Sequence, residues 1–483
     1  MVSSQHDRAN PYDVGLDFAL PDLGGMVPAG GRIETGEANP TRLYYDTADR
    51  DLLRHHITLA HHTDGTDTGW RLMVPADKAR TDIWTPAATG DAVPEELATL
   101  VTGIALGEPL RQMAVVSTTR RAHRLLDRDE HLLAEVTDDV VHATVAGDAA
   151  LVSEWREVDV DLGDGVGRSL LTKIDKRLTR AGANPSKHAS TLGRALTGDH
   201  TPDGADSESP AREAITRYLD AQVQAIVAGD VWLRRGLDPI HSTRVGIRRF
   251  RSTLRVFKTL FDAETVAHLD AELSWYAGVL GEVRDRQVQR ARFTGAVADL
   301  PSELVMGPVA ARIENDLLAE QYRYLGHAMD ALDSDRYRDL IATVGRWRTT
   351  PPWTAPATDS AVTKATRKAG RKANKRLTAT VADPDDAALH RARKAAKRAR
   401  YAAELAAPVL GKKKAKKEAK KYKKIQTILG EHQDSVVAAQ TLRTLGARAG
   451  STPGENGFAF GLLYGLELQA AQRARADAAR LAR

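Results

Sequence analysis

The chain has 483 residues and no cysteine. Without thiols it can form neither disulfides nor thiolate metal sites, and the cytoplasm is the expected compartment. Aromatic residues make up only 5% of the chain, so base-stacking platforms for nucleic acid are scarce. No apolar run reaches the ~18 residues of a membrane helix, and the first residues lack a signal-peptide pattern. We therefore expect no membrane association.

Charge is present but unevenly distributed. The formal net charge is +5, yet residues 1–205 carry 21 basic and 32 acidic side chains, a net of −11, so the remainder carries +16. Residues 361–430 alone hold 22 basic and 5 acidic side chains, a net of +17. A basic region segregated in this way predicts a polyanionic partner.

The chain divides into four segments of different character, which predict a multi-domain α and β protein. Residues 1–12 are expected to be a disordered leader. Residues 13–196 alternate short β-type runs with turns and predict an antiparallel sheet or barrel with one charged face. Residues 197–210 are rich in Gly, Pro and Ser and predict a linker, and residues 211–483 predict an all-helical domain. The strands we expect are 41–45, 57–62, 70–74, 115–126, 131–136, 140–146 and 155–162.

A basic ladder stands out in the helical half, at residues 241–255. Its members share one helix face about 21 Å long, at offsets of 0, 3, 7, 10 and 14 residues. They are His241, Arg244, Arg248, Arg251 and Arg255. No carboxylate lies between the first and the last of them, so this row of like charges must find anions or water.

The ladder is part of an internal repeat. The segment HSTRVGIRRFR at 241–251 corresponds to HRARKAAKRAR at 390–400, and LGEVRDRQV at 280–288 corresponds to LGEHQDSVV at 429–437. Both pairs are 149 residues apart. The second ladder consists of His390, Arg393, Lys397 and Arg400. We expect two related halves, about 211–350 and 360–483, whose ladders face each other across a groove.

These duplicated motifs resemble the CHAD domain, over roughly residues 210–483. The resemblance implies two pseudo-symmetric four-helix bundles with a basic groove that binds inorganic polyphosphate without catalysis. By this resemblance the binding positions are the nine ladder residues, flanked by Arg249, Lys394 and Arg398. Lys423 and Lys424, which precede the second Leu-Gly-Glu signature on the same predicted helix, are further candidates.

Residues 12–196 resemble a CYTH domain, the triphosphate tunnel fold, through RLYYDTADRDLLRHH, STTRRAHRLLD and VSEWREVDVDL. Active members open with E-x-E-x-K, and here the corresponding stretch reads DVGLD at 13–17. Met73 stands where a phosphate-binding lysine is common, whereas four carboxylates persist: Glu135, Glu157, Asp159 and Asp161. The resemblance therefore implies a catalytically degenerate domain. The alternative is an unusual active site that uses Arg71, Arg120, Glu157 and Asp159.

Other charged residues in the helical half invite an interpretation. The segment 412–424 has nine lysines in thirteen positions and is either a solvated run or a nonspecific polyanion contact. A stripe at helical spacing contains Lys364, Arg367 or Lys368, Arg371 and Lys375. Asp285 and Asp434 occupy equivalent positions in the repeat and are expected to orient ladder arginines. No ligand spacing for a metal is seen.

The favoured hypothesis is noncatalytic binding of inorganic polyphosphate, with association to polyphosphate granules of a bacterial cytoplasm. No cofactor, metal or catalytic residue is expected. Two alternatives stay open: a CYTH-type metal-dependent triphosphatase or polyphosphatase whose helical half holds the substrate, and a nucleic-acid-binding protein. The sequence leaves the oligomeric state, the preferred chain length and any protein partners undecided.

Overall fold

The computed structural model describes residues 11–63, 68–75, 80–86, 92–146, 150–186, 188, 191–197, 209–382 and 385–482. The chain splits into two compact units, Met1–Ala205 and Asp206–Arg483, called here the sheet domain and the helical domain. Most of the expected leader and linker lies outside the described residues. Tyr12, assigned to the leader, is however the buried first residue of a strand. Its ring packs in the sheet-domain core, so the expected leader was drawn too long.

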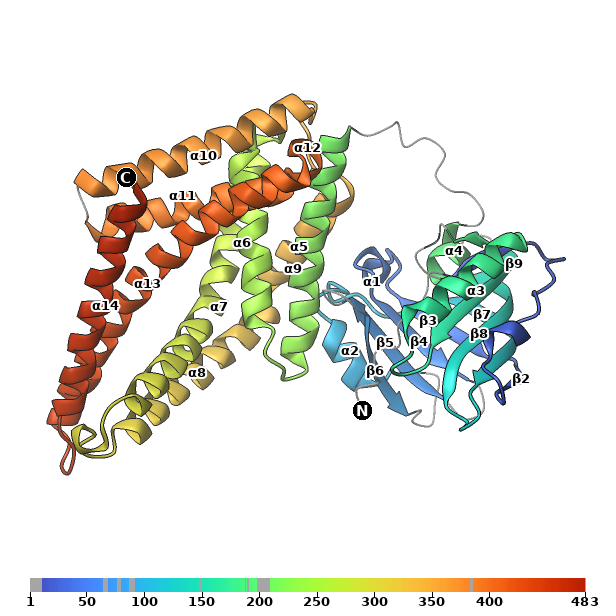
Figure 1. Ribbon diagram of the computed structural model, residues 1–483, viewed down its shortest axis with the longest axis horizontal. Coiled ribbons are helices and arrows are strands. Elements are labelled where there is room, and N and C mark those ends of the chain that lie inside the picture. The colour runs from blue at the N-terminus through green and yellow to red at the C-terminus, as the bar shows by residue number, and fades with distance from the viewer. Residues whose placement is uncertain are drawn as a thin grey trace. The chain divides into compact units, whose positions relative to one another are not determined.

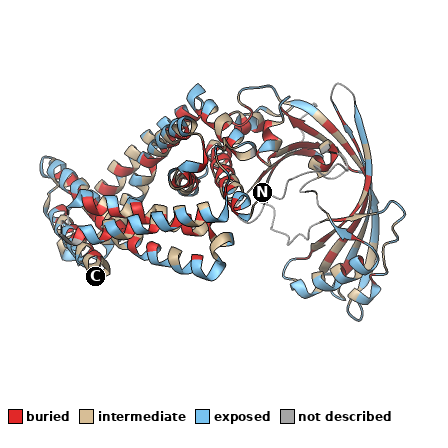
Figure 2. Cartoon of the chain, turned by 90° about the horizontal axis from the view of Figure 1, so that it is seen from above, coloured by how far each residue is buried: buried red, intermediate tan, exposed pale blue. Residues whose placement is uncertain are grey.

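The sheet domain is built on ten strands, and all of their pairings are antiparallel (Figure 1). The strands are β1 (Tyr12–Val14), β2 (Arg32–Ala38), β3 (Thr41–Asp46), β4 (Thr58–His62), β5 (Gly69–Pro75), β6 (Arg80–Pro86), β7 (Arg111–Leu126), β8 (Leu132–Val145), β9 (Leu151–Leu162) and β10 (Asn184–Pro185). Their order is β10-β1-β9-β8-β7-β3-β4-β5-β6, with β2 paired to the far half of β7. The expected antiparallel sheet is confirmed. It is strongly curved (Figure 2), and pairing among the described strands leaves its path open at β10 and β6.

One strand prediction was wrong. The runs 131–136 and 140–146 are parts of a single strand, β8, which pairs along its length with β7 and β9. The two runs looked separate because Thr137, Asp138 and Asp139 interrupt the apolar pattern. All three side chains are buried in the structure. The sheet domain therefore contains buried polar and charged side chains in the middle of a strand.

Four helices accompany the sheet: α1 (Asp51–Arg54), α2 (Glu95–Val101), α3 (Arg168–Arg180) and α4 (Thr191–Thr197). Side chains alternate between the two faces of a strand. Val158 and Val160 of β9 thus pack with Ile174 and Leu178 of α3 on one face. Trp155, two positions along β9 from the charged Glu157, packs with Leu192 and Ala195 of α4 on the other.

The helical domain contains ten helices among the described residues. They are α5 (Pro210–Arg234), α6 (Ile240–Val256), α7 (Ala263–Ala298), α8 (Val309–Leu332), α9 (Asp335–Thr349), α10 (Asp359–Ala382), α11 (Asp386–Leu405), α12 (Ala407–Leu410), α13 (Lys412–Gly450) and α14 (Phe458–Ala482). Several begin at a side-chain cap, as Ser209 accepts from the Arg212 amide at 3.2 Å and Asp262 from the Thr265 amide at 2.8 Å. None of the described helices is long and apolar enough to cross a membrane.

The repeat is visible in the packing order. Helices α5, α6, α7 and α8 pack in sequence, and α10, α11, α13 and α14 repeat that order. α9, which packs on α5, has no counterpart among the described helices of the second half. The halves also share a core, in which Phe293 and Ile313 of the α7–α8 hairpin meet Leu442 and Phe460 of α13–α14 (Figure 1). They are therefore one joined body.

Candidate anion-binding site

The first ladder faces away from the hydrophobic core, because the opposite side of α6 packs into that core. Ile247, Phe250 and Leu254 are fully buried, so the arginines between them must point away from that core. On α11 the buried positions are alanines instead, among them Ala392, Ala396 and Ala399. Such small side chains let a neighbouring helix approach closely.

α6 and α11 pack directly against each other. The ladders therefore meet at a helix crossing, whereas the sequence suggested that they face each other across a groove. Arg248 Nε donates to the Tyr401 hydroxyl at 3.0 Å. Arg249 lies 3.6 Å from Glu404. Both contacts join the first ladder helix to the second, so the duplicated basic segments form one site.

The centre of the crossing is a group of four cations, which we call the axial cluster: Arg244, Arg248, Arg393 and Lys397. Burial, together with the neighbouring Arg393, Arg248 and Arg244, lowers the pKa of Lys397 to about 7, while Asp434 opposes them. A lysine with this pKa is only partly charged at neutral pH. The cluster thus holds more positive charge than the protein by itself stabilises.

The repeated Leu-Gly-Glu signatures have a structural reason. A Cβ placed on Gly281 would lie 3.3 Å from Arg244 Nη1, and one on Gly430 would lie 3.4 Å from Arg393 Nη2. Each glycine therefore leaves room for a ladder guanidinium against α7 or α13. Asp285 lies 3.4 Å from Arg244 and Asp434 lies 3.5 Å from Arg393. The aspartates orient these arginines as the sequence predicted, at distances longer than those of strong charge-assisted bonds.

The two ladder histidines begin their rows in different surroundings. Burial, then Arg284, Arg248 and Arg244, lowers the pKa of His241. Burial and Lys394 lower the pKa of His390, whose Nδ1 is hydrogen-bonded to Gln433 Oε1 at 2.9 Å. Both imidazoles are therefore mainly neutral at pH 7 without a ligand, and an anion nearby would favour their charged form.

Two carboxylates pair with the outer arginines of the ladders, Asp270 from a neighbouring helix and Glu404 from α11 itself. Asp270 of α7 accepts from Arg251 at 3.0 Å and from Arg255 at 2.6 Å. Glu404 accepts from Arg400 at 2.8 Å. The sequence segment 241–255 has no acidic residue, but Asp270 of the next helix supplies the carboxylate that this segment lacks.

A second basic group contains two residues that the sequence analysis named, Arg255 and Arg398, and three that it did not connect with them. We call it the lateral cluster: Arg255, Lys258, Lys372, Arg376 and Arg398. Burial, then Arg255, Arg376 and Arg251, lowers the pKa of Arg398, while Asp270 opposes this. Arg376, burial, Arg398, Lys368 and Lys258 lower the pKa of Lys372. On α10 Lys372 and Arg376 thus interact with Arg398, and Lys368 with Lys372, so this face lies one position from the predicted Arg371 and Lys375.

The remaining candidates lie at the periphery. Lys394 is exposed close to His390, and Lys423 and Lys424 are exposed on α13. In the described part of the chain no hydrogen bond or ion pair joins Lys423 or Lys424 to either ladder. The structure therefore brings together the ladder residues, Arg249 and Arg398, and leaves these three lysines outside the crossing.

The sheet domain has a polar row on the face that carries α4. Register places Asp13, Glu157, Asp139 and Arg120 opposite one another on adjacent strands. Arg120 holds Asp139 at 2.6 Å, and Arg194 of α4 holds Asp13 at 2.6 Å. Burial raises the pKa of Glu157, which also accepts from Trp155 Nε1 at 2.8 Å. Two of the carboxylates are thus held by arginines of the same domain.

Basic residues share this face, more of them than the sequence suggested. Arg42 lies opposite His62 on the adjacent strand, and Arg71 lies opposite Ala60 two residues away. Burial, Arg42, Arg71 and His61 lower the pKa of His62 to about 3. The carboxylates expected for a CYTH-like site therefore share their sheet face with a few basic side chains, Arg42, Arg71 and Arg120.

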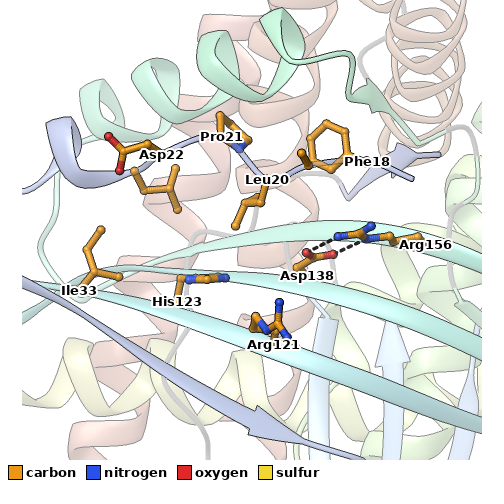
Figure 3. A pocket seen from close by; sticks show the side chains of 11 residues that line it. Phe18, Leu20, Pro21, Asp22, Ile33, Arg121, His123, Asp138 and Arg156 are labelled. Atoms are coloured by element: carbon orange, nitrogen blue, oxygen red, sulfur yellow. Dashed lines mark hydrogen bonds and ion pairs between the residues drawn. The ribbon is translucent and has the colours of Figure 1, made fainter. Parts of the chain in front are cut away.

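A cavity of about 490 Å³ lies on the opposite face of this sheet. Figure 3 shows its charged floor, where Arg156 and Asp138 form a bidentate pair at 2.8 and 2.7 Å, with Arg121 and His123 nearby. Residues 18–21, Leu23 and Ile33 form an apolar rim, which Asp22 interrupts. Asp138 and Arg156 neutralise each other, and Arg121 pairs with Glu37 outside the lining, so we assign no ligand to this cavity.

Comparison with known proteins agrees with the duplicated ladders. Residues 217–443 match the CHAD domain family. Over 461 residues, 91% of this chain, it is 34% identical to the Mycobacterium tuberculosis proteins Uncharacterized protein MT2285 (strain CDC 1551 / Oshkosh) and Uncharacterized protein Rv2226 (strain ATCC 25618 / H37Rv), covering 89% of each. The chain is a CHAD-domain protein and belongs to one family with these two relatives.

Solved structures give weaker likenesses. PptA from Streptomyces chartreusis is 22% identical at a TM-score of 0.48, covering 57% of this chain and 99% of that one. The CHAD domain of the plant Ricinus communis is 26% identical at a TM-score of 0.44, covering 56% and 92%. A putative adenylate cyclase from Bacillus halodurans is 11% identical at a TM-score of 0.24, covering 33% and 82%.

Proposed function

We propose that the helical domain binds inorganic polyphosphate at the crossing of α6 and α11. The observation that carries this proposal is the axial cluster, in which burial and three arginines lower the pKa of Lys397 to about 7. A chain of phosphates would supply the missing negative charge, since phosphate accepts charge-assisted hydrogen bonds from both Arg and Lys. The CHAD family resemblance points to the same ligand class.

Nucleic acid is the less suitable polyanion for this site. Recognition of single strands usually needs exposed aromatic rings on which bases can stack. The rings at the crossing, Phe250 and Tyr401, are 0% and 3% exposed. Tyr401 is also covered by the guanidinium groups of Arg249 and Arg400, at 5.7 and 5.4 Å from the ring centroid. A thin ligand with charge along its whole length and no bases fits these groups better.

We assign no catalytic step to the helical domain, and association with polyphosphate granules follows from the proposed binding. A metal-dependent triphosphatase in the sheet domain is the second candidate, because Glu157, Arg120 and Arg71 share one sheet face. Against it, Arg120 and Arg194 already bind carboxylates. Release of phosphate in the presence of Mg²⁺ or Mn²⁺, abolished by Glu157→Ala, would establish the second candidate.

The decisive experiment is a binding titration of the full chain with long-chain polyphosphate at several salt concentrations. Arg244→Ala combined with Arg393→Ala should weaken binding by about a hundredfold and flatten the salt dependence, since each charge that contacts phosphate adds to the slope. Arg443→Ala with Arg448→Ala removes two exposed arginines of α13 and serves as the charge-matched control. Equal affinity and slope in the two double variants would reject the proposal, provided that circular dichroism shows both to be folded.

A further inference from the structure

The repeat relates two contacts across the crossing. One joins two side chains of opposite charge, and the other joins two of like charge. Adding 149 to Arg249 gives Arg398, and subtracting 149 from Glu404 gives Arg255. The ion pair between Arg249 and Glu404, 3.6 Å apart, thus corresponds to a pairing of Arg398 with Arg255. One side of the crossing thus has a carboxylate at the position where the other side has a second arginine.

The side with two arginines has a single carboxylate to balance them. Asp270 pairs with Arg255 and Arg251, but among the described residues no carboxylate lies within ion-pair distance of Arg398. The repeat position of Asp270 is Ala419, so this aspartate belongs to the first half alone. Three arginines, Arg251, Arg255 and Arg398, thus share Asp270 on this side, whereas on the equivalent side Glu404 balances two, Arg249 and Arg400. The lateral cluster therefore keeps the larger excess of positive charge.

The helices that flank the two sides differ in the same sense. Offsets of 149 residues relate Lys368, Lys372 and Arg376 of α10 to Leu219, Val223 and Val227 of α5. The three α5 residues are fully buried, and α9 packs on that helix. Lys368 and Lys372 are exposed, and Arg376 is half-buried. The face that is apolar and covered in the first half is cationic and open in the second.

We propose that a bound phosphate chain leaves the axial cluster on one side only, over Arg255, Arg398 and the 368–372–376 face of α10, and that Glu404 excludes the equivalent path on the other side. This inference rests on the proposed function, because it concerns the route of the same ligand. A carboxylate repels a phosphate chain, whereas unpaired guanidinium and ammonium groups attract it. Glu404 is then a residue that determines specificity, and the lateral cluster is an extension of the binding site that short ligands do not reach.

The test compares the full chain with two double variants of α10. Lys372→Ala with Arg376→Ala removes the lateral charges. Arg371→Ala with Lys375→Ala removes the same charge from the same helix, about 100° around its axis. The affinity of each protein is measured for triphosphate and for long-chain polyphosphate. The lateral variant should lose on the order of tenfold in affinity for the long chain and less than threefold for triphosphate, while the control changes little for either.

Single substitutions test the excluded path. Glu404→Gln should strengthen long-chain binding several-fold because it removes the repelling carboxylate, and Arg255→Glu should weaken it because it copies the ion pair onto the open side. Equal losses in the lateral and control variants would overturn the one-sided route, as would an unchanged affinity of Glu404→Gln. A wild-type chain that does not bind polyphosphate would instead reject the proposed function itself.

Discussion

At the scale of single residues, Lys397 is the group of the site whose charge changes near neutral pH. Its ammonium group is half-buried beside Arg248 and Arg393, and Asp434 is the acidic group that acts on it. Since its pKa is about 7, the free protein releases part of this charge near neutral pH. A polyanion restores the charge, so ligand binding and proton uptake at Lys397 are coupled.

This coupling predicts a pH-dependent affinity. Binding of long-chain polyphosphate should weaken by up to about tenfold as the pH rises through 7, because deprotonated Lys397 no longer attracts phosphate. Lys397→Arg keeps the charge and should remove most of this dependence between about pH 7 and 9. Titrations at several pH values check this, and His241 and His390 account for any dependence left below pH 6.5. A wild-type affinity that is constant through pH 7 would contradict the prediction.

The stability of the free protein should change in the opposite direction. The folded-state pKa of Lys397 lies below that of an unfolded lysine, ~10.4. Between these values the unfolded chain binds more protons, so the free energy of unfolding rises with pH in that interval. Lys397→Met should therefore raise the melting temperature at pH 7, with less effect at pH 10. Thermal unfolding at both pH values measures this difference.

At the scale of helices, the start of α13 is electrostatically unfavourable. It begins with Lys412, Lys413 and Lys414 after Gly411, with no side-chain cap and no acidic residue in its first turn. The positive end of the helix dipole disfavours cations there, by about 0.3–1 kcal/mol each. The lysine run was expected as a loop-helix or a contact segment, and the structure places it in the helix.

Anions should therefore stabilise this helix start. Lys413→Glu is expected to increase amide protection over residues 412–420 at low salt, because the carboxylate interacts favourably with the free amide groups of the first turn. Adding sulfate to the wild-type chain should produce part of the same effect. Hydrogen exchange followed by mass spectrometry measures both, and Lys424→Glu, farther from the helix end, is the control. Equal protection in the two variants would contradict the dipole argument.

What could be predicted from the sequence differs between elements. The ladder helices were found from their spacing, because residues of one helix face follow from a period of 3.6. The partners Asp270, Lys372 and Arg376 were not found as such, since they lie on other helices and only the packing brings them near Arg398. The single strand β8 was split at Asp138 because burial of that carboxylate depends on Arg156 of the next strand. Local sequence patterns thus predicted most helices and strands, whereas the composition of the site depends on contacts between them that the sequence does not show.

At the scale of the whole molecule, charge is segregated between two compact units. Residues 1–205 carry a net of −11 and the rest of the chain +16, a division that follows the boundary near Ala205. The shared core of α7, α8, α13 and α14 was not predictable from the repeat, which indicated two related halves with facing ladders but not the hydrophobic contacts between them. That core fixes the halves together, and the acidic unit adds an opposite net charge to the same chain.

Removing the acidic unit should therefore change binding in a salt-dependent way. Residues 206–483 alone are expected to bind long-chain polyphosphate more tightly than the full chain at low salt, by about three- to tenfold. The difference should disappear toward ~1 M salt, where charges are screened beyond about 3 Å. Parallel titrations of both proteins at several salt concentrations check this. Weaker binding by the truncated protein at every concentration would show that the sheet domain itself contributes to the contact.

The glycines at positions 281 and 430 have a further, thermodynamic consequence. Each leaves room beside a long helix for a guanidinium group, which an aspartate holds at 3.4 or 3.5 Å. Arg244 and Arg393 have therefore lost much of their rotamer freedom before any ligand arrives, a loss that can reach about 1.5–2 kcal/mol for a free arginine. Because this entropy is given up during folding, association with a flexible polymer need not include it again. The duplicated glycine thus transfers part of the entropic cost of binding to the folding of the protein.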